Sequence, residues 1–255
     1  MSNSLIHQLE SLSFNAWPAA LVRLVDGWRV RYNWQVTRRA NSAWPNESHK
    51  RLELATKLAW VEEFYRQWNC RVRYQICPAS VPANLDDILA ERGYTSQART
   101  AVQTAAVATV LSRALPNPAF KVTITGGVSQ AWLATYRQIE QLSKPAAEIR
   151  LSILQRIRPC SGYALVQAGG RPVAVGLAVA EQGWCGIFCM ATQVDFRRQR
   201  AAATILHSLA GWSQEQGATQ LYLQVMENNE PAQALYGRAG FETVYHYHYR
   251  ESPAG

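Results

Sequence analysis

The chain has 255 residues, enough for one large domain or for two domains of about 100–150 residues each. Hydrophobic residues make up 48% of it and charged residues 17%, and it contains nine Trp and eleven Tyr, so a disordered chain is excluded. The net charge of +8 favours an anionic partner: nucleic acid, a membrane surface or a phosphorylated cofactor.

Membrane and metal-binding classes find little support. The longest run without a charged residue, 122–136, is shorter than the roughly 20 apolar residues of a spanning helix. The first residues carry no basic region of the kind that opens a signal peptide, so we expect a cytoplasmic protein without membrane association. The five cysteines form no C-x-x-C pair, which predicts buried neutral thiols rather than a zinc site or a disulfide framework.

The first half, residues 1–113, shows two clear patterns. Gly27–Trp34 and Val36–Ala43 predict a pair of strands, and an apolar stripe from Leu54 to Trp68 predicts a helix. The segment 114–118 then contains two prolines, which remove backbone donors and disfavour helix. We therefore predict a domain boundary there.

The second half, residues 119–255, predicts a longer series of elements in the order strand, two helices, three strands, helix, strand, helix, strand. The first five have the expected bounds Phe120–Thr125, Ser129–Leu142, Ala146–Ile157, Gly162–Ala168 and Pro172–Glu181. The rest are Cys185–Thr192, a helix that ends near Gln216, Leu221–Val225, a short helix from Asn229, and Glu242–Arg250. This alternation indicates an α/β protein.

Two motifs stand where helices of the second half begin. The first is Arg197-Arg198-Gln199-Arg200-Ala201-Ala202. The second, N-x-x-A-x-x-L-Y-x-x-x-G-F, consists of Asn229, Ala232, Leu235, Tyr236, Gly240 and Phe241. Together with the order of elements, these motifs resemble the GNAT superfamily of acetyl-CoA-dependent acetyltransferases. The resemblance covers 119–255 and implies a mixed, mainly antiparallel sheet flanked by helices.

The resemblance implies that the first motif binds acetyl-CoA. In the family it reads Q/R-x-x-G-x-G/A, and its backbone N–H groups at a helix N-terminus bind the diphosphate. In one alignment Arg197 opens the motif, Arg200 stands at the first glycine and Ala202 at the second small position. A shift by one residue keeps both positions small but moves the preceding strand out of phase, and either way one glycine is missing. Three arginines at a helix N-terminus oppose the helix dipole, which favours a polyanion beside them.

The strand that ends at Met190-Ala191-Thr192 is the second part of the implied cofactor site. In the family, backbone groups of this strand bind the acetyl carbonyl and the pantetheine arm. We expect this strand and Leu221–Val225 to be parallel neighbours that separate, with the arm in the gap. Asn229 and Tyr236 complete the expected cofactor-binding residues.

The resemblance assigns catalysis to Tyr236, which would protonate the departing CoA thiolate as general acid. Glu227 is the expected general base and Glu181 an alternative, although each carboxylate equally suits a solvated surface. His246 and His248 share one face of the last strand. No third ligand accompanies this pair, so no metal is expected.

A shift of 147 residues aligns the first half with the second, since Gly93-Tyr94 then falls on Gly240-Phe241. In this alignment Glu53 stands in the phosphate loop, Pro82 replaces Asn229 and Leu89 replaces Tyr236. An anionic side chain in that loop would repel a diphosphate. The first half is therefore predicted to be a degenerate GNAT-like copy that is structural or walls the acceptor site.

The expected function is transfer of acetyl from acetyl-CoA, as co-substrate, to a primary amine by direct attack. The alternatives are a non-catalytic acyl-CoA sensor or interaction protein and, less favoured, a basic RNA-associated protein. We expect no nucleic acid partner, and a monomer or homodimer. The sequence does not identify the acceptor.

Overall fold

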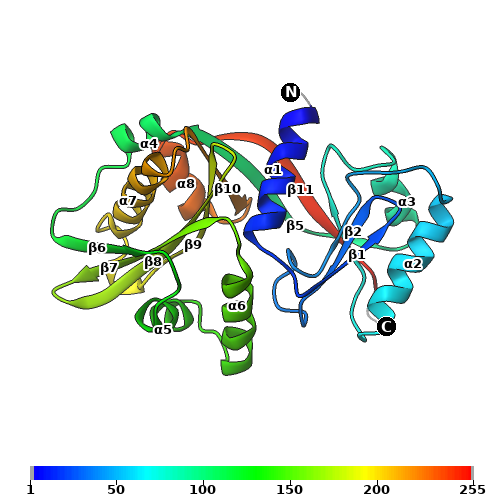
Figure 1. Cartoon of the computed structure of the whole chain (residues 1–255), viewed down its shortest axis with the longest axis horizontal. Coiled ribbons are helices and arrows are strands. Elements are labelled where there is room, and N and C mark those ends of the chain that lie inside the picture. The colour runs from blue at the N-terminus through cyan, green and yellow to red at the C-terminus, as the bar shows by residue number, and fades with distance from the viewer. Residues whose placement is uncertain (1–2, 254–255) are drawn as a thin grey trace.

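The computed structural model describes residues 3–253, whose strands form one eleven-stranded sheet (Figure 1). The order across the sheet is β1-β2-β3-β4-β11-β5-β10-β9-β8-β7-β6. The pairs β3–β4 and β9–β10 are parallel, and the other pairs are antiparallel. The protein is thus α/β, with a large, mostly antiparallel sheet flanked by helices, as the sequence predicts.

The elements of the first half come first in the chain. Its strands are β1 (Leu21–Val25), β2 (Trp28–Tyr32), β3 (Ala43–Trp44), β4 (Arg73–Ile76) and β5 (Thr95–Ala106). Its helices are α1 (Asn3–Ala16), α2 (Leu54–Arg66), α3 (Leu85–Glu91) and α4 (Val107–Arg113). None of the helices among residues 3–253 has the length and apolar character needed to cross a bilayer.

The second half follows the predicted order of elements. Its strands are β6 (Phe120–Thr125), β7 (Cys160–Ala168), β8 (Arg171–Glu181), β9 (Trp184–Thr192), β10 (Gln220–Met226) and β11 (Glu242–Glu251). Its α-helices are α5 (Gln130–Ile139), α6 (Lys144–Arg156), α7 (Ala201–Glu215) and α8 (Glu230–Arg238), and a short 3-10 helix covers Val194–Phe196. Ser129 and Ser143 cap α5 and α6 by accepting a hydrogen bond from a backbone N–H two or three residues into the helix. These predictions are confirmed to within a few residues.

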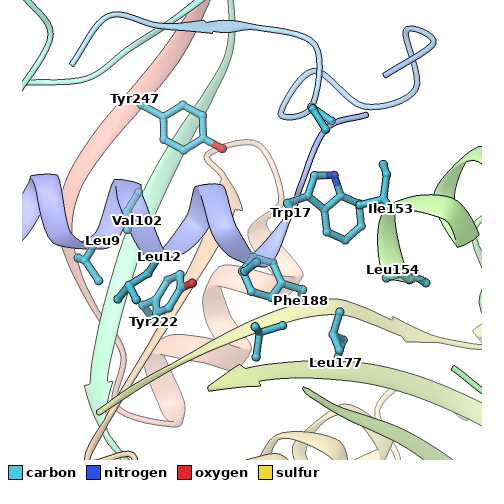
Figure 2. Packing of buried hydrophobic residues seen from close by; sticks show 14 of the residues in the cluster. Leu9, Leu12, Trp17, Val102, Ile153, Leu154, Leu177, Phe188, Tyr222 and Tyr247 are labelled. Carbon is cyan, nitrogen blue, oxygen red and sulfur yellow. The ribbon is translucent and has the colours of Figure 1, made fainter. Parts of the chain in front are cut away.

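Helices cover both faces of the sheet and separate the buried side chains into three clusters. One cluster joins α1, α5 and α6 to the central strands, and Figure 2 shows Leu9 and Leu12 of α1 packed near Val102 of β5 and Tyr222 of β10. A second cluster lies beneath α4, α7 and α8, on the opposite face of the second half. The third lies beneath α2 and α3 in the first half. α1 lies between the two halves (Figure 1).

The last strand of each half is inserted into the sheet of the other. β5, from the first half, lies between β10 and β11 and pairs with both in antiparallel register. β11, from the second half, lies between β4 and β5. Each half therefore contributes one strand to a position flanked by strands of the other.

The predicted strand Val36–Ala43 is wrong, because this segment forms turns and only Ala43 enters a strand. The side chain of Asn41 causes the difference. Its Oδ1 accepts hydrogen bonds from the backbone N–H groups of Asn33 and Gln35, and its Nδ2 donates to the carbonyls of Val36 and Thr37. A side chain that bonds nearby backbone in this way replaces the ladder of a strand.

Candidate active site

β9 and β10 run side by side only over their first residues. The parallel register extends from Gln220 opposite Trp184 to Leu223 opposite Ile187, although both strands continue for several residues. Beyond Ile187, the edge of β9 facing β10 has no strand partner among residues 3–253, so its backbone groups are available to a ligand. The predicted separation of these strands is confirmed.

A β-bulge widens this separation. On the β8 side, the register passes from Leu177 opposite Phe188 to Val175 opposite Ala191, so two β9 residues face one β8 residue. Cys189, at the bulge, has a positive φ of 52°. Bulges bend a strand and redirect its side chains, and they are common beside active sites. Here the bulge turns the end of β9 away from β10.

A cavity of about 430 Å³ occupies the space at this separation. The second half contributes residues from β9, β10, α5, α6 and α8, among them Met190, Asn229, Tyr236, Glu140 and Arg150. The first half contributes Trp17 and the loop residues Thr37, Arg38 and Arg39. Residues of both halves therefore line the same cavity.

Tyr236 lies on α8 and lines the cavity with only 7% of its surface exposed. Its ring packs edge-on against Phe241, with 5.8 Å between ring centroids. Burial raises the pKa of Tyr236 to about 12, because the phenolate would lose its hydration. The hydroxyl is therefore protonated at neutral pH and able to donate a proton.

The structure explains why the second motif has asparagine at 229 and glycine at 240. Asn229 caps α8, because its Oδ1 accepts a hydrogen bond of 3.3 Å from the backbone N–H of Ala232. Gly240 adopts a φ of +95°, and a Cβ there would lie 2.5 Å from the side chain of Thr109. Glycine is thus required by both conformation and space, and the motif holds Tyr236 against the cavity.

The first motif forms the start of α7. Arg200 immediately precedes the helix in a left-handed conformation with φ of 65°, and Arg197–Arg200 are exposed. No side chain caps the helix, and the first backbone N–H bonded within it is that of Thr204, which donates to the carbonyl of Arg200 at 2.8 Å. The preceding N–H groups have no partner within the helix, and such groups at helix starts bind anions. Because glycine adopts the left-handed conformation most readily, the geometry favours the alignment with Arg200 at the glycine position.

The structure brings together only part of the predicted cofactor set. Met190, Asn229 and Tyr236 line the cavity, whereas Ala191, Thr192 and the Arg197–Ala202 loop lie outside its wall, where β9 ends and α7 begins. The loop is tied to the end of β9 by a 3.5 Å hydrogen bond from Nε of Arg197 to the carbonyl of Thr192.

The two predicted carboxylates do not line the cavity. Glu227 is 41% exposed and forms ion pairs with Arg99 at 2.9 Å and His246 at 3.1 Å. Glu181 accepts hydrogen bonds from the side chain of Asn15. Among the described residues that line the cavity, the single carboxylate is Glu140, which follows the last turn of α5. No motif marked Glu140, because its place depends on how α5 packs on the sheet.

The cysteines differ in their environments. All five are free, and Cys77 and Cys185 are buried, but Cys160 is exposed, so the prediction of buried thiols is wrong for it. Cys160 lies at the first position of β7, outside the packed part of the sheet. Cys189 lines the cavity, and burial raises its pKa to about 11. Its thiol is therefore protonated at neutral pH, which disfavours a role as nucleophile.

The tyrosines of β11 are buried and its histidines half-buried, as alternation predicts. His248 lies 2.8 Å from a carboxylate oxygen of Asp86, and His246 pairs with Glu227. Among residues 3–253, no three His, Cys, Asp or Glu side chains are grouped to hold a metal ion.

A family model described as "Probable histone acetyltransferase Rv0428c C-terminal" matches residues 3–250. The chain belongs to this acetyltransferase family. It is an acetyltransferase of the GNAT superfamily, and its motifs are those of the resemblance seen in the sequence.

Known proteins are similar to this GNAT protein over most of its length. An uncharacterized N-acetyltransferase from Bacillus subtilis, YobR, is 28% identical over 245 residues, which cover 96% of this chain and 98% of that protein. A GCN5-related N-acetyltransferase from Kribbella flavida has a similar structure, with a TM-score of 0.73 and 16% identity over 97% of this chain and 95% of the other. A tandem GNAT protein from the clavulanic acid biosynthesis pathway has a TM-score of 0.64 and 13% identity, and covers 84% of this chain and 75% of its own. The structural likenesses support the fold.

Proposed function

We propose that this GNAT protein uses acetyl-CoA to acetylate a primary amine. The observation that carries the proposal is the protonated hydroxyl of Tyr236 at a cavity formed where β9 and β10 separate. A hydroxyl that is protonated at neutral pH can act as the general acid that gives its proton to the departing thiolate.

The chain's own residues fit the parts of acetyl-CoA. The uncapped start of α7 and the exposed arginines Arg197, Arg198 and Arg200 suit a diphosphate, because they combine free N–H groups with positive charge. The unpaired edge of β9 suits the amide groups of a pantetheine arm. Acetyl-CoA supplies the activated acetyl group, as a thioester.

Direct attack accounts for the balance of bonds and protons. The amine nitrogen forms a bond to the acetyl carbonyl carbon, and the bond from that carbon to sulfur breaks. A carboxylate accepts the amine proton, and Tyr236 donates its proton to sulfur. Glu227 is the base expected from sequence, and Glu140 is the carboxylate at the cavity wall. Cys189 stays protonated, so a covalent acetyl-cysteine is not required.

The competing function is a non-catalytic acyl-CoA sensor, and the arginine in place of glycine at position 200 motivates it. A large side chain beside the phosphate site would weaken the cofactor's close approach to the main chain. Such a protein would bind acetyl-CoA without turning it over.

The test combines binding and turnover. Acetyl-CoA at 100 times its Kd should stabilise the fold by about 2.7 kcal/mol, seen as a rise in Tm. Release of free thiol from acetyl-CoA should then increase with a panel of primary amines. A rise in Tm without amine-dependent thiol release would support the sensor. No change in Tm at millimolar acetyl-CoA would contradict both functions.

A further inference from the structure

Arg39 lies in the loop of residues 36–42, which was wrongly predicted to be a strand, and its side chain lines the cavity. That side chain is half-buried, and its buried Nε has no hydrogen-bond partner among residues 3–253. The guanidinium lies over the rings of Trp17 and Phe188, 5.8 and 5.6 Å from their centroids. Figure 2 shows these two rings facing each other where α1 ends, with β9 beside them.

No carboxylate of residues 3–253 forms an ion pair with Arg39, whereas its neighbour Arg38 pairs with Glu251 at 2.6 Å. Tyr247 hydrogen-bonds the Arg39 side chain, but a protonated tyrosine supplies no negative counter-charge. Tyr247 and Tyr249 donate their hydroxyl hydrogens to the side chains of Gln224 and Gln75, each at 3.3 Å. Arg39 therefore keeps a full positive charge in a partly dehydrated position, which costs free energy unless an anion approaches.

The charged side chains of the cavity wall are three arginines and one glutamate. They are Arg38, Arg39, Arg150 and Glu140. Glu140 lies 3.9 Å from Nη1 of Arg150, which also donates a hydrogen bond to the hydroxyl of Tyr136. The negative charge of Glu140 is thus shared with Arg150, and that of Glu251 with Arg38 and Arg73. Among the described residues that line the cavity, Arg39 is the cation without an ion-pair partner.

We infer that the acceptor amine carries an anionic group, such as a carboxylate, which binds the guanidinium of Arg39. This inference rests on the proposed function and specifies its acceptor class. Arg39 belongs to the wall built by the first half, α5 and α6, whereas the groups suited to the CoA diphosphate lie at the start of α7. A planar guanidinium binds a carboxylate through two parallel hydrogen bonds, so it selects for that group strongly.

The experiment uses matched amines that differ in one charge: glycine and glycinamide, phenylalanine and phenylalaninamide, lysine and lysinamide. A lysine-rich cationic peptide is the opposite extreme. Thiol release from acetyl-CoA gives kcat and KM for the full-length protein and for Arg39→Gln, Arg39→Lys and the control Arg23→Gln. Arg23 is exposed on β1, far along the sheet from the cavity.

The acid of a pair should be the better substrate, and Arg39→Gln should raise its KM about 10- to 100-fold while leaving kcat nearly unchanged. The amide should be insensitive to the substitution. Arg39→Lys should recover part of the affinity, and Arg23→Gln should match the wild type. Equal rates for acids and amides, or a preference for the cationic peptide, would overturn the inference.

A binding measurement decides the matter even where no amine of the panel reacts. The acids, added to the protein with saturating CoA, should raise the Tm more than their amides, and Arg39→Gln should remove the difference. Equal shifts overturn the inference. Weaker acetyl-CoA binding in Arg39→Gln would also overturn it, by assigning the arginine to the cofactor. Failure of acetyl-CoA to bind the wild type is a separate result, which contradicts the proposed function itself.

Discussion

The two halves of the chain share a plan but differ where ligands would bind. Helix α2 and strands β4 and β5 begin at residues 54, 73 and 95, and α7, β10 and β11 begin at 201, 220 and 242, always 147 residues later. The residue before α7 is Arg200, left-handed and exposed. The residue before α2 is Glu53, with an extended backbone at φ −62°. One helix start is open and basic, and the other is acidic.

The spaces beside the parallel strand pairs differ even more. In the first half, residues of α1 lie beside the end of β3, and the pocket there, lined by His7, Glu10 and Trp44, holds only about 10 Å³. In the second half, the corresponding cavity holds about 430 Å³. Leu89, the counterpart of Tyr236, is fully buried in the core. The first half thus has a parallel strand pair like that of the second half, but almost no space beside it for a ligand.

The largest expected effect is on kcat, and it distinguishes Tyr236 from Leu89, its counterpart in the first half. Tyr236→Phe removes the proton donor and should lower kcat by about 10²- to 10⁴-fold, with acetyl-CoA binding unchanged. Leu89→Ala should instead lower the free energy of unfolding by about 2–5 kcal/mol and leave kcat per folded molecule intact. Thiol release and denaturant unfolding measure the two quantities. Full activity in Tyr236→Phe would remove the tyrosine from the mechanism.

The next largest expected effect is the loss of kcat on removing the general base, for which Glu140 and Glu227 are the candidates. Glu140→Gln should lower kcat by about 10²-fold, because a general base contributes that much and Glu140 lines the cavity. Glu227→Gln breaks the surface ion pairs with Arg99 and His246, and such exposed pairs contribute little. Steady-state kinetics of both variants decide between them. The larger loss in Glu227→Gln would support the base expected from the sequence.

Substituting glycine for the residue before α7 and for the residue before α2 should change the free energy of unfolding in opposite directions. Arg200→Gly should raise the free energy of unfolding by about 1 kcal/mol, because glycine adopts the left-handed conformation without strain. The same change at its counterpart, Glu53→Gly, should lower it by about 0.5–1 kcal/mol, because an extended residue gains only flexibility. Chemical denaturation provides the values. If both substitutions changed the free energy of unfolding in the same direction, residues 200 and 53 would not differ in backbone conformation as described.

The smallest expected effect concerns Glu10 on α1, in the filled pocket of the first half. Burial raises its pKa above 4.5, against the hydrogen bonds that it accepts from Tyr245 and Gln75. The folded state therefore binds the proton more tightly than the unfolded state, and this stabilisation is lost as pH rises from 4.5 through the folded pKa. Glu10→Gln removes the loss, so its Tm should exceed that of the wild type increasingly toward neutral pH. A constant difference in Tm across this range would contradict the raised pKa.

Sequence patterns predicted the elements of the second half well. In the first half they predicted β2 and α2 correctly and Val36–Ala43 wrongly, for identifiable reasons. Local periodicity and caps define elements such as α5 and α6, and the Asn229 motif defines α8. The loop around Asn41 was wrongly predicted as a strand. Its turns are fixed by hydrogen bonds from the Asn41 side chain to nearby backbone, and a periodicity analysis does not detect such bonds. Arg39 and Glu140 carried no motif. Their place at the cavity depends on packing between segments about 100 residues apart.

Because β5 and β11 each lie between strands of the other half, the folding of the first half is coupled to that of the second. If the chain were cut near Pro116, the sheet of each fragment would lack one strand. That missing strand, β5 or β11, would belong to the other fragment. Neither piece would be a self-sufficient folding unit, but the two together would be complementary, as a split protein is. The first half therefore supplies a central strand that the sheet of the second half cannot replace from its own residues.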